Sequence, residues 1–174
     1  ESYYRNDQYD DALNVFQDLY NTSALYGRPE SSLIPYNLAY CHFKKENYPA
    51  AMRWFDTYLG DPRAGFRKEA LERRADCLFI QKKYKEASEA YELVLADYFK
   101  ANDIYPYYQA AISYGLIRNS ARKVELLANV LDASPSAEFY PEALFELGRA
   151  YVAQEEDDKA FECFNTLAGN VKDS

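Results

Sequence analysis

Histidine, which many catalytic and metal-binding sites use, occurs once in this chain of 174 residues. His42 is the one histidine, so neither a histidine-based catalytic triad nor a multi-histidine metal site can be assembled. It stands where tyrosines stand in similar segments of the chain, and we interpret it as a packing residue with a polar tip. Glycine-rich phosphate-binding loops are absent as well. The sequence therefore predicts no catalytic residue, no metal site, no cofactor and no enzyme activity.

Carboxylates are the remaining candidates for acid–base chemistry or cation binding. Glu69, Glu72 and Asp76 lie at helical spacing, yet nothing in the sequence places them around a substrate. The acidic run 155–158 offers oxygen ligands for a cation. Because the helix dipole stabilises acidic residues at a helix start, we favour the interpretation of this run as a solvated turn.

Three cysteines, Cys41, Cys77 and Cys163, each fall inside a predicted helix beside apolar positions. The odd count and the absence of a Cys-x-x-Cys pair argue against a metal or redox site. Cys41 and Cys77 occupy equivalent places in successive segments, where helix axes lie roughly 8–10 Å apart, too far for easy bridging. We predict three buried free thiols.

The elements that position these residues are helical hairpins, and residues 141–169 show one most clearly. Apolar residues three and four apart run through Leu144–Tyr151 and again through Ala160–Leu167, which is typical of two amphipathic helices. The acidic turn between them is too short for another element. Gly148 marks the place where we expect the two helices to cross, because a small residue permits close approach.

The same spacing recurs along the chain. Small residues return 36 or 37 positions apart on the first helix of each hairpin: Ala39, Ala75, Ala111 and Gly148. A second series marks the other helix: Ala51, Ala87 and Ala160. In the copy at 105–133, either Lys123 or Val124 must take that place. Leu-Gly followed by Tyr in one helix, then Ala and Phe in the next, resembles the tetratricopeptide repeat (TPR).

This resemblance covers nearly the whole chain and implies an all-α fold. The expected architecture is an α-α superhelix, or solenoid, of about nine helices, with four full helical hairpins after a truncated first one. We predict a single domain over residues 1–174. Its repeats are expected at about 1–21 (partial), 32–62, 68–100, 104–135 and 141–170.

Helices are expected at 1–5, 7–20, 32–46, 48–59, 66–82, 84–98, 105–118, 120–133, 138–153 and 156–168. Asn47 is the predicted cap of the helix at 48–59. Because the chain starts inside a repeat, we expect it to be a piece of a longer protein. Its opening repeat would then expose Tyr3, Tyr4 and Phe16 and associate with another copy through that end.

In TPR proteins the first helix of each pair lines the concave inner face, and the resemblance implies the same here. Helical spacing then gives eight candidate partner-binding residues on that face: Tyr36, Tyr40, Phe43, Glu72, Asp76, Phe79, Tyr108 and Arg149. We expect the carboxylates among them to be exposed. Aromatic residues on an open groove suit contact with a peptide or a glycan. The alternative, that neighbouring loops or a preceding repeat bury the aromatic residues, stays open.

Composition narrows the range of partners. The formal net charge of −8 and a pI near 4.8 argue against nucleic acid and anionic membranes, because phosphates would be repelled. The sequence contains no run of 18 apolar residues, so we predict no direct membrane insertion of this segment. We predict a non-catalytic scaffold that binds a partner protein or peptide in the concave groove. An architectural spacer within a longer solenoid and a glycan-binding module are the alternatives.

Residues 134–174 carry a second resemblance, to repeats of bacterial cell-envelope TPR proteins. These are the Tol-Pal-associated periplasmic coordinator and the outer-membrane assembly lipoproteins. Pro135 and Ser136, followed by the pattern of Ala143–Tyr151, match their repeat style, which carries over no binding residue. The resemblance implies a periplasmic or outer-membrane-associated protein, with a cytoplasmic localisation as the alternative.

Overall fold

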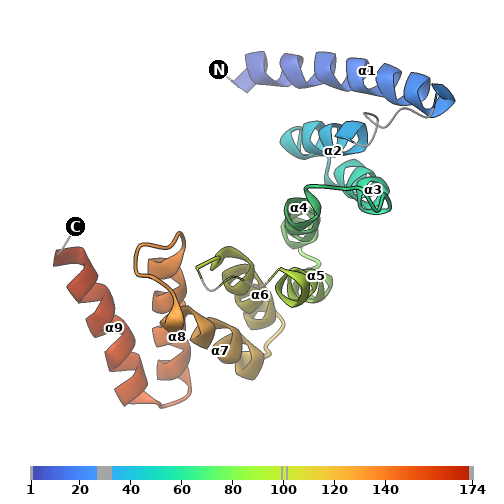
Figure 1. The fold of residues 1–174 in the computed structure, drawn as a ribbon. Helices are drawn as coiled ribbons and strands as arrows, with labels where there is room; N and C mark the ends of the chain where they lie inside the picture. Colours follow the sequence, from blue (N-terminus) through green and yellow to red (C-terminus); the bar gives the residue numbers. More distant parts are fainter. Residues whose placement is uncertain (1, 27–32, 99, 101, 173–174) are drawn as a thin grey trace. The chain divides into compact units, whose positions relative to one another are not determined.

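The computed structural model describes the backbone of residues 2–26, 33–98, 100 and 102–172, and side chains within 8–22, 33–98, 100 and 102–169. Over these ranges the chain is all-α, as predicted, with nine α-helices and no strand. The helices fall into two compact units, residues 1–82 and 83–174 (Figure 1). The division lies inside the predicted repeat 68–100, and the single domain stays a prediction.

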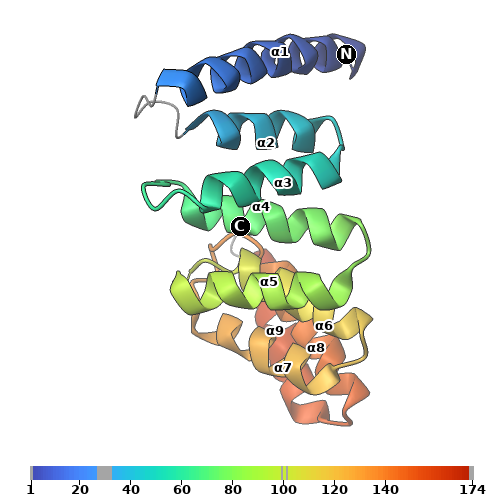
Figure 2. The same ribbon diagram turned by 90° about the vertical axis from the view of Figure 1, so that its right-hand side faces the viewer.

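The first unit is a row of four helices in which each helix packs on the next (Figure 2). They are α1 (Ser2–Tyr26), α2 (Ile34–Lys44), α3 (Tyr48–Leu59) and α4 (Arg67–Ile80). Consecutive helices run in opposite directions, as stacked helical hairpins do. Asn47 caps α3 as predicted, because its side-chain oxygen accepts a hydrogen bond from the Ala50 amide at 3.4 Å.

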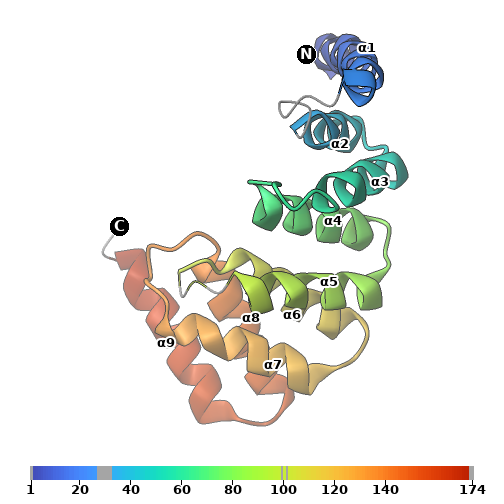
Figure 3. The ribbon, with the colours of Figure 1, turned by 45° about the vertical axis from the view of Figure 1, so that its right-hand side comes forward.

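The second unit holds five helices, each of which packs on its neighbours in sequence (Figure 3). They are α5 (Tyr84–Asp97), α6 (Tyr105–Leu116), α7 (Ser120–Ala128), α8 (Tyr140–Ala153) and α9 (Asp157–Lys172). A 3-10 turn, η2 (Asn129–Asp132), follows α7. The predicted helix at 120–133 is therefore α-helical in its first part and 3-10 in its second.

The opening helix differs from the prediction. The sequence suggests a turn near residue 6 and a helix end at 20, whereas α1 runs unbroken from Ser2 to Tyr26. A continuing helix satisfies its backbone hydrogen bonds internally, while a turn at residue 6 needs a preceding helix to pack against. The side chains of Tyr3 and Tyr4 lie outside the described residues, and Phe16 is half-buried.

Four turns between consecutive helices share one backbone conformation. Four residues that follow α2, α4, α6 and α8 have a left-handed conformation with φ between 59° and 62°: Glu46, Lys82, Arg118 and Glu155. After the first of them, the Asn47 amide donates to the His42 carbonyl at 2.9 Å, and the same bond recurs at Asn119 and Glu156. This is the hydrogen bond of a Schellman turn. A left-handed residue other than glycine costs about 1–2 kcal/mol, which other interactions of the fold must offset.

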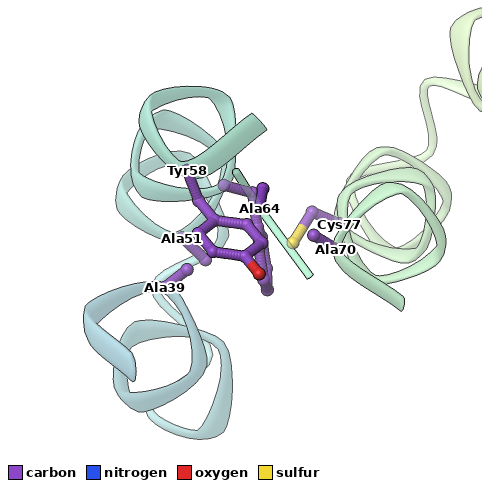
Figure 4. Close-up of a cluster of buried hydrophobic side chains, with 7 residues drawn as sticks. Ala39, Ala51, Tyr58, Ala64, Ala70 and Cys77 are labelled. Carbon is purple, nitrogen blue, oxygen red and sulfur yellow. The ribbon is translucent and has the colours of Figure 1, made fainter. Parts of the chain in front are cut away.

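Small residues and aromatic rings share the core of the first unit. Ala39 of α2 and Ala51 of α3 are fully buried with the ring of Phe55. Figure 4 shows the Tyr58 ring beside both alanines. The Tyr58 hydroxyl accepts a hydrogen bond from the Phe66 amide at 2.8 Å, so the core of α3 also fixes the residue that precedes α4.

Gly148 lies where α8 and α9 cross, as the sequence predicts. A Cβ atom added to it would lie 2.7 Å from Cε1 of Phe164 and 3.2 Å from Cβ of Cys163. Protein interiors are too densely packed to absorb such contacts without movement. The two helices therefore approach as closely as a glycine allows.

We predict that Gly148→Ala lowers the free energy of unfolding by about 1–2 kcal/mol, because the Phe164 ring must move to admit the methyl group. Gly148→Leu is expected to cost roughly 3 kcal/mol or more. Gly169→Ala in α9 is the matched control, since no atom lies within 4 Å of its added carbon. There, alanine should be neutral or slightly stabilising. Urea unfolding followed by circular dichroism measures all three, and equal stability of wild type and Gly148→Leu would contradict the crossing.

Candidate functional site

A cluster of aromatic rings joins α2 to the start of α4. The Tyr36 ring is at its centre, with its centroid 5.0 Å from Tyr40, 5.1 Å from Tyr58 and 5.3 Å from Phe66. The Tyr36 and Phe66 rings are stacked, with 28° between their planes. Phe66 is nevertheless 51% exposed, so the stack presents aromatic surface to solvent. We call Tyr36, Tyr40, Phe66 and Glu69 the α2–α4 surface.

The carboxylate of this surface is held by tyrosine hydroxyls. Glu69 follows Phe66 by three positions and accepts a hydrogen bond from the Tyr40 hydroxyl. Burial and this hydrogen bond raise the pKa of Tyr40 to about 12. Burial and a hydrogen bond with the same carboxylate raise the pKa of Tyr36 well above its usual range. Both hydroxyls therefore stay protonated at neutral pH. A carboxylate has about four acceptor sites, so the exposed Glu69 keeps the capacity to bind a further donor.

Glu72 and Asp76 are predicted partner-binding residues whose expected exposure is wrong. They are only 6% and 5% exposed. Glu72 forms an ion pair with Lys68 at 2.5 Å, and Asp76 forms one with Arg73 at 2.5 Å, both within α4. Buried carboxylates need such partners because an unpaired buried charge is costly. The positive side chains of the same helix therefore largely neutralise both carboxylates. Contact of Glu72 and Asp76 with a partner stays a prediction.

The remaining predicted residues of the first unit contribute to packing. Phe43 lies edge-on to Tyr48, with ring centroids 5.7 Å apart, and 6.4 Å from Tyr40. It is half-buried, and so is Phe79 near the end of α4. The structure thus brings Tyr36, Tyr40 and Phe43 together along α2.

Tyr108 and Arg149, the last two predicted residues, belong to the second unit. The Tyr108 ring stacks on Phe139, with centroids 6.0 Å apart and 20° between the planes. Burial, followed by the charges of Glu146 and Glu142, raises the pKa of Tyr108. The Arg149 side chain is 63% exposed, and its Nη1 lies 2.8 Å from Oε1 of Glu146. These two residues therefore belong to a different unit from the other six.

Lys123, rather than Val124, takes the small-residue position of α7. A Cβ atom on Gly115 of α6 would lie 3.1 Å from Cδ of Lys123, so the absent side chain at Gly115 leaves room for the lysine. The Lys123 ammonium lies 2.7 Å from Oε2 of Glu146 in α8. Burial by itself would raise the pKa of Glu146, but the hydrogen bond and charge of Lys123, with those of Arg149, lower it. One lysine thus connects three helices.

The residues that the sequence offers for chemistry, the cysteines and the histidine, are buried or half-buried in the fold. The three cysteines are free and buried, as predicted. Burial raises the pKa of each thiol, that of Cys77 to about 12, which disfavours the reactive thiolate. His42 is half-buried, and burial, with the charges of Arg53 and Lys45, lowers the pKa of its imidazole. Across the described residues, no cluster of three or more His, Cys, Asp or Glu side chains is arranged to hold a metal ion. No helix in that part of the chain has the length and apolar character to cross a membrane.

Sequence reasoning missed Phe66 and Glu69 as members of the surface. Both stand at the start of α4, where the helical pattern of the repeat has barely begun. A positional signal was present, however. Phe66 precedes the small residue Ala75 by nine positions, and Phe139 precedes Gly148 by the same number.

Comparison with known proteins decides the family. Residues 5–94, just over half of the chain, match the profile of the family described as "Anaphase-promoting complex, cyclosome, subunit 3", and residues 142–174 match a tetratricopeptide-repeat profile. The chain belongs to the tetratricopeptide-repeat proteins. No curated protein matches it at a significant level. TPR proteins generally mediate protein–protein interactions and are generally not enzymes.

Solved TPR structures share this fold. MamA from Desulfovibrio magneticus RS-1 is 19% identical with a TM-score of 0.67, over 94% of this chain and 97% of that one. The C-terminal part of a TPR protein from Cytophaga hutchinsonii is 20% identical with a TM-score of 0.72, over 98% and 64%. YrrB, described as a TPR protein with an unusual peptide-binding site, is 18% identical with a TM-score of 0.69, over 94% and 78%. At these identities the likeness shows the fold alone.

From the Lys123–Glu146 pair we predict that the stability of this TPR protein depends on pH. Because the folded state lowers the pKa of Glu146 from its ordinary 4.5, the charged carboxylate stabilises the fold above that pH. The stabilisation is lost as pH falls through the lowered pKa. Glu146→Gln should therefore destabilise by about 1–3 kcal/mol at pH 7 and by little in strong acid.

Glu125→Gln is the control for that experiment, because Glu125 pairs with Arg122 while 67% exposed. An exposed pair contributes about 0–1 kcal/mol, so this change should be small at every pH. Urea unfolding at several pH values measures both variants. A cost for Glu146→Gln that does not change with pH would contradict the role of the charge.

Proposed function

We propose that this TPR protein is a non-catalytic scaffold and that its α2–α4 surface binds an extended segment of a partner protein. The observation that carries the proposal is the Phe66 ring, which is half-exposed and stacked on Tyr36. The hydroxyl of Tyr40, another neighbour of Tyr36, donates to the Glu69 carboxylate. A ring that is already held by a stack loses little freedom when a partner covers it. Aromatic anchors of this kind supply much of the affinity of many protein interfaces.

The chemistry of the surface defines the segment that it suits. Ring faces offer contact area to apolar side chains, and they also attract cations. The Glu69 carboxylate favours a lysine or arginine on the partner. Glu72 and Asp76 add little attraction, because Lys68 and Arg73 already neutralise them. The proposed partner segment is therefore apolar in part and carries at least one basic residue.

Two further features of the protein stay proposals. The resemblance of residues 134–174 to cell-envelope repeats supports a periplasmic or outer-membrane-associated localisation. Association of two copies through α1 is supported by Val15 and Leu19, which are 57% and 48% exposed. Light scattering at rising concentration tests that association, and a strict monomer would contradict it.

Phe66→Ala is the sharpest test of the α2–α4 surface, because Phe66 is exposed while Tyr36 also supports the core through Tyr58. A random-peptide phage library panned against the chain supplies ligands, and titration calorimetry measures their affinity. We expect Phe66→Ala to weaken binding roughly 30-fold, which corresponds to about 2 kcal/mol. Phe161→Ala on α9, where the phenylalanine is 69% exposed, is the matched control and should leave the affinity unchanged.

A second variant guards against an indirect effect. Tyr40→Phe keeps the ring but removes the hydroxyl that holds Glu69. It should therefore lower the affinity for basic peptides more than the affinity for neutral ones. Circular dichroism confirms that each variant keeps its helix content. If Phe66→Ala and the double variant Tyr36→Ala/Tyr40→Ala both fold and bind unchanged, the surface is not the binding site. The architectural spacer would then be the better description.

A further inference from the structure

The second unit repeats the arrangement found at the start of α4. Phe139 directly precedes α8 as Phe66 directly precedes α4. In both places a glutamate follows three positions later, Glu142 and Glu69, and both glutamates are exposed. The start of α6 lacks this pair of an aromatic ring and a carboxylate. The positions 36 residues after Phe66 and Glu69 are Asn102 and Tyr105.

The ring stack recurs as well. Tyr108, 72 positions after Tyr36, stacks on Phe139 with 20° between the planes, as Tyr36 stacks on Phe66 with 28°. Tyr105 adds a further ring, with its centroid 5.1 Å from Phe139. Each unit therefore presents one phenylalanine that is supported from behind by tyrosine.

Phe139 keeps its place at a cost in backbone energy. Its φ is 64°, a left-handed conformation that is rare for bulky residues and costs about 1–2 kcal/mol. The other described non-glycine residues with positive φ lie in the turns between paired helices, whereas Phe139 precedes α8. The contacts with Tyr105 and Tyr108 offset this cost.

The surroundings of the Phe139 ring are acidic. In the second unit, a shallow pocket of about 330 Å³ beside Phe139 is lined on its polar side by Asp103, Glu138 and Lys100. With Glu142 nearby in sequence, carboxylates outnumber the single amine. The pocket thus favours a cationic guest over an anionic one.

In the first unit, the cations at the start of α4 are already engaged. Arg67 donates to the Leu59 carbonyl at 2.8 Å, and Lys68 and Arg73 are held in ion pairs. Glu69 is bound by neutral tyrosine hydroxyls, which leave its charge in place. A cation from outside can therefore pair with Glu69, and the opposing charge nearby is that of Arg67, which a carbonyl oxygen does not neutralise.

We propose that the chain carries two copies of one arginine-binding subsite: subsite 1, Phe66 with Glu69, and subsite 2, Phe139 with Glu142. In each, a guanidinium stacks on the phenylalanine ring and donates hydrogen bonds to the glutamate. This rests on the proposed function and names the side chain that the partner segment supplies. Arginine fits better than lysine because its planar group stacks on rings and donates two parallel hydrogen bonds to a carboxylate.

The two subsites differ in how the carboxylate is held. Tyr40 donates to Glu69, whereas the position 72 residues further along is Ile112, which has no hydroxyl. Phe139 is also less exposed than Phe66. Subsite 1 is therefore expected to bind arginine more tightly than subsite 2.

The test is a nuclear magnetic resonance titration of the ¹⁵N-labelled 174-residue chain with N-acetyl-arginine methylamide. The citrulline analogue has nearly the same shape without the charge, and the lysine analogue has the charge without the planar group. We expect arginine to shift the amide signals of Glu69 and Glu142 with saturation, lysine to bind more weakly, and citrulline to shift neither. Glu69→Gln should weaken binding at subsite 1 about tenfold and leave subsite 2 unchanged. Glu142→Gln should do the reverse.

Three results would overturn the proposal: equal shifts with citrulline, saturation at one subsite alone, or glutamine variants that bind as the wild type does. Its failure is distinguishable from failure of the proposed function. If Phe66→Ala still loses the phage-selected peptides while the arginine titration fails, the scaffold proposal stands and only the arginine subsites are wrong.

Discussion

The close approach of paired helices is the constraint on which the rest of this structure depends. Ala39 and Ala51 are fully buried in the core that α2 and α3 share, and Gly148 leaves no room for one added carbon. Helices that approach this closely exclude large side chains from their line of contact. The large residues of α2 therefore flank that line, and Tyr36 and Tyr40 reach the element that follows the hairpin. The aromatic surface is a consequence of the hairpin packing.

The exception in α7 shows how strict this constraint is. Lys123 is far larger than the alanine that other copies carry, and two compensations accompany it. Gly115 has no side chain at the place where Lys123 passes, and the carboxylate of Glu146 pairs with the half-buried ammonium. A long side chain at a crossing position thus requires both a space and a charged partner. This repeat therefore has a charged link at a position where the other copies have apolar packing.

The sequence predicts the helices and the small residues at their crossings, because helical spacing is a local property of the chain. It does not predict that α1 continues past residue 6, since a turn there depends on packing by another helix. Spacing also places Glu72 and Asp76 on a face without telling whether neighbouring structure covers that face. Lys68 and Arg73, the cations four and three positions before them, would pair with these carboxylates on a buried face and on an exposed face alike. Phe66 and Glu69 escape prediction because a helix start lies outside the repeating pattern, and its neighbours are set by the preceding loop.

Net charge is a poor guide to where this chain attracts a partner. The chain carries −8, yet several of its carboxylates, Glu72, Asp76 and Glu146 among them, are bound to cations of the same unit. Paired charges largely cancel at the distances over which a partner approaches. Attraction therefore comes from carboxylates that are oriented without being neutralised. Tyrosine hydroxyls do this for Glu69, because they donate hydrogen bonds and carry no charge at neutral pH. The carboxylate of α4 that is available to a partner is therefore the exposed Glu69 near the helix start, whereas Glu72 and Asp76 are buried and paired.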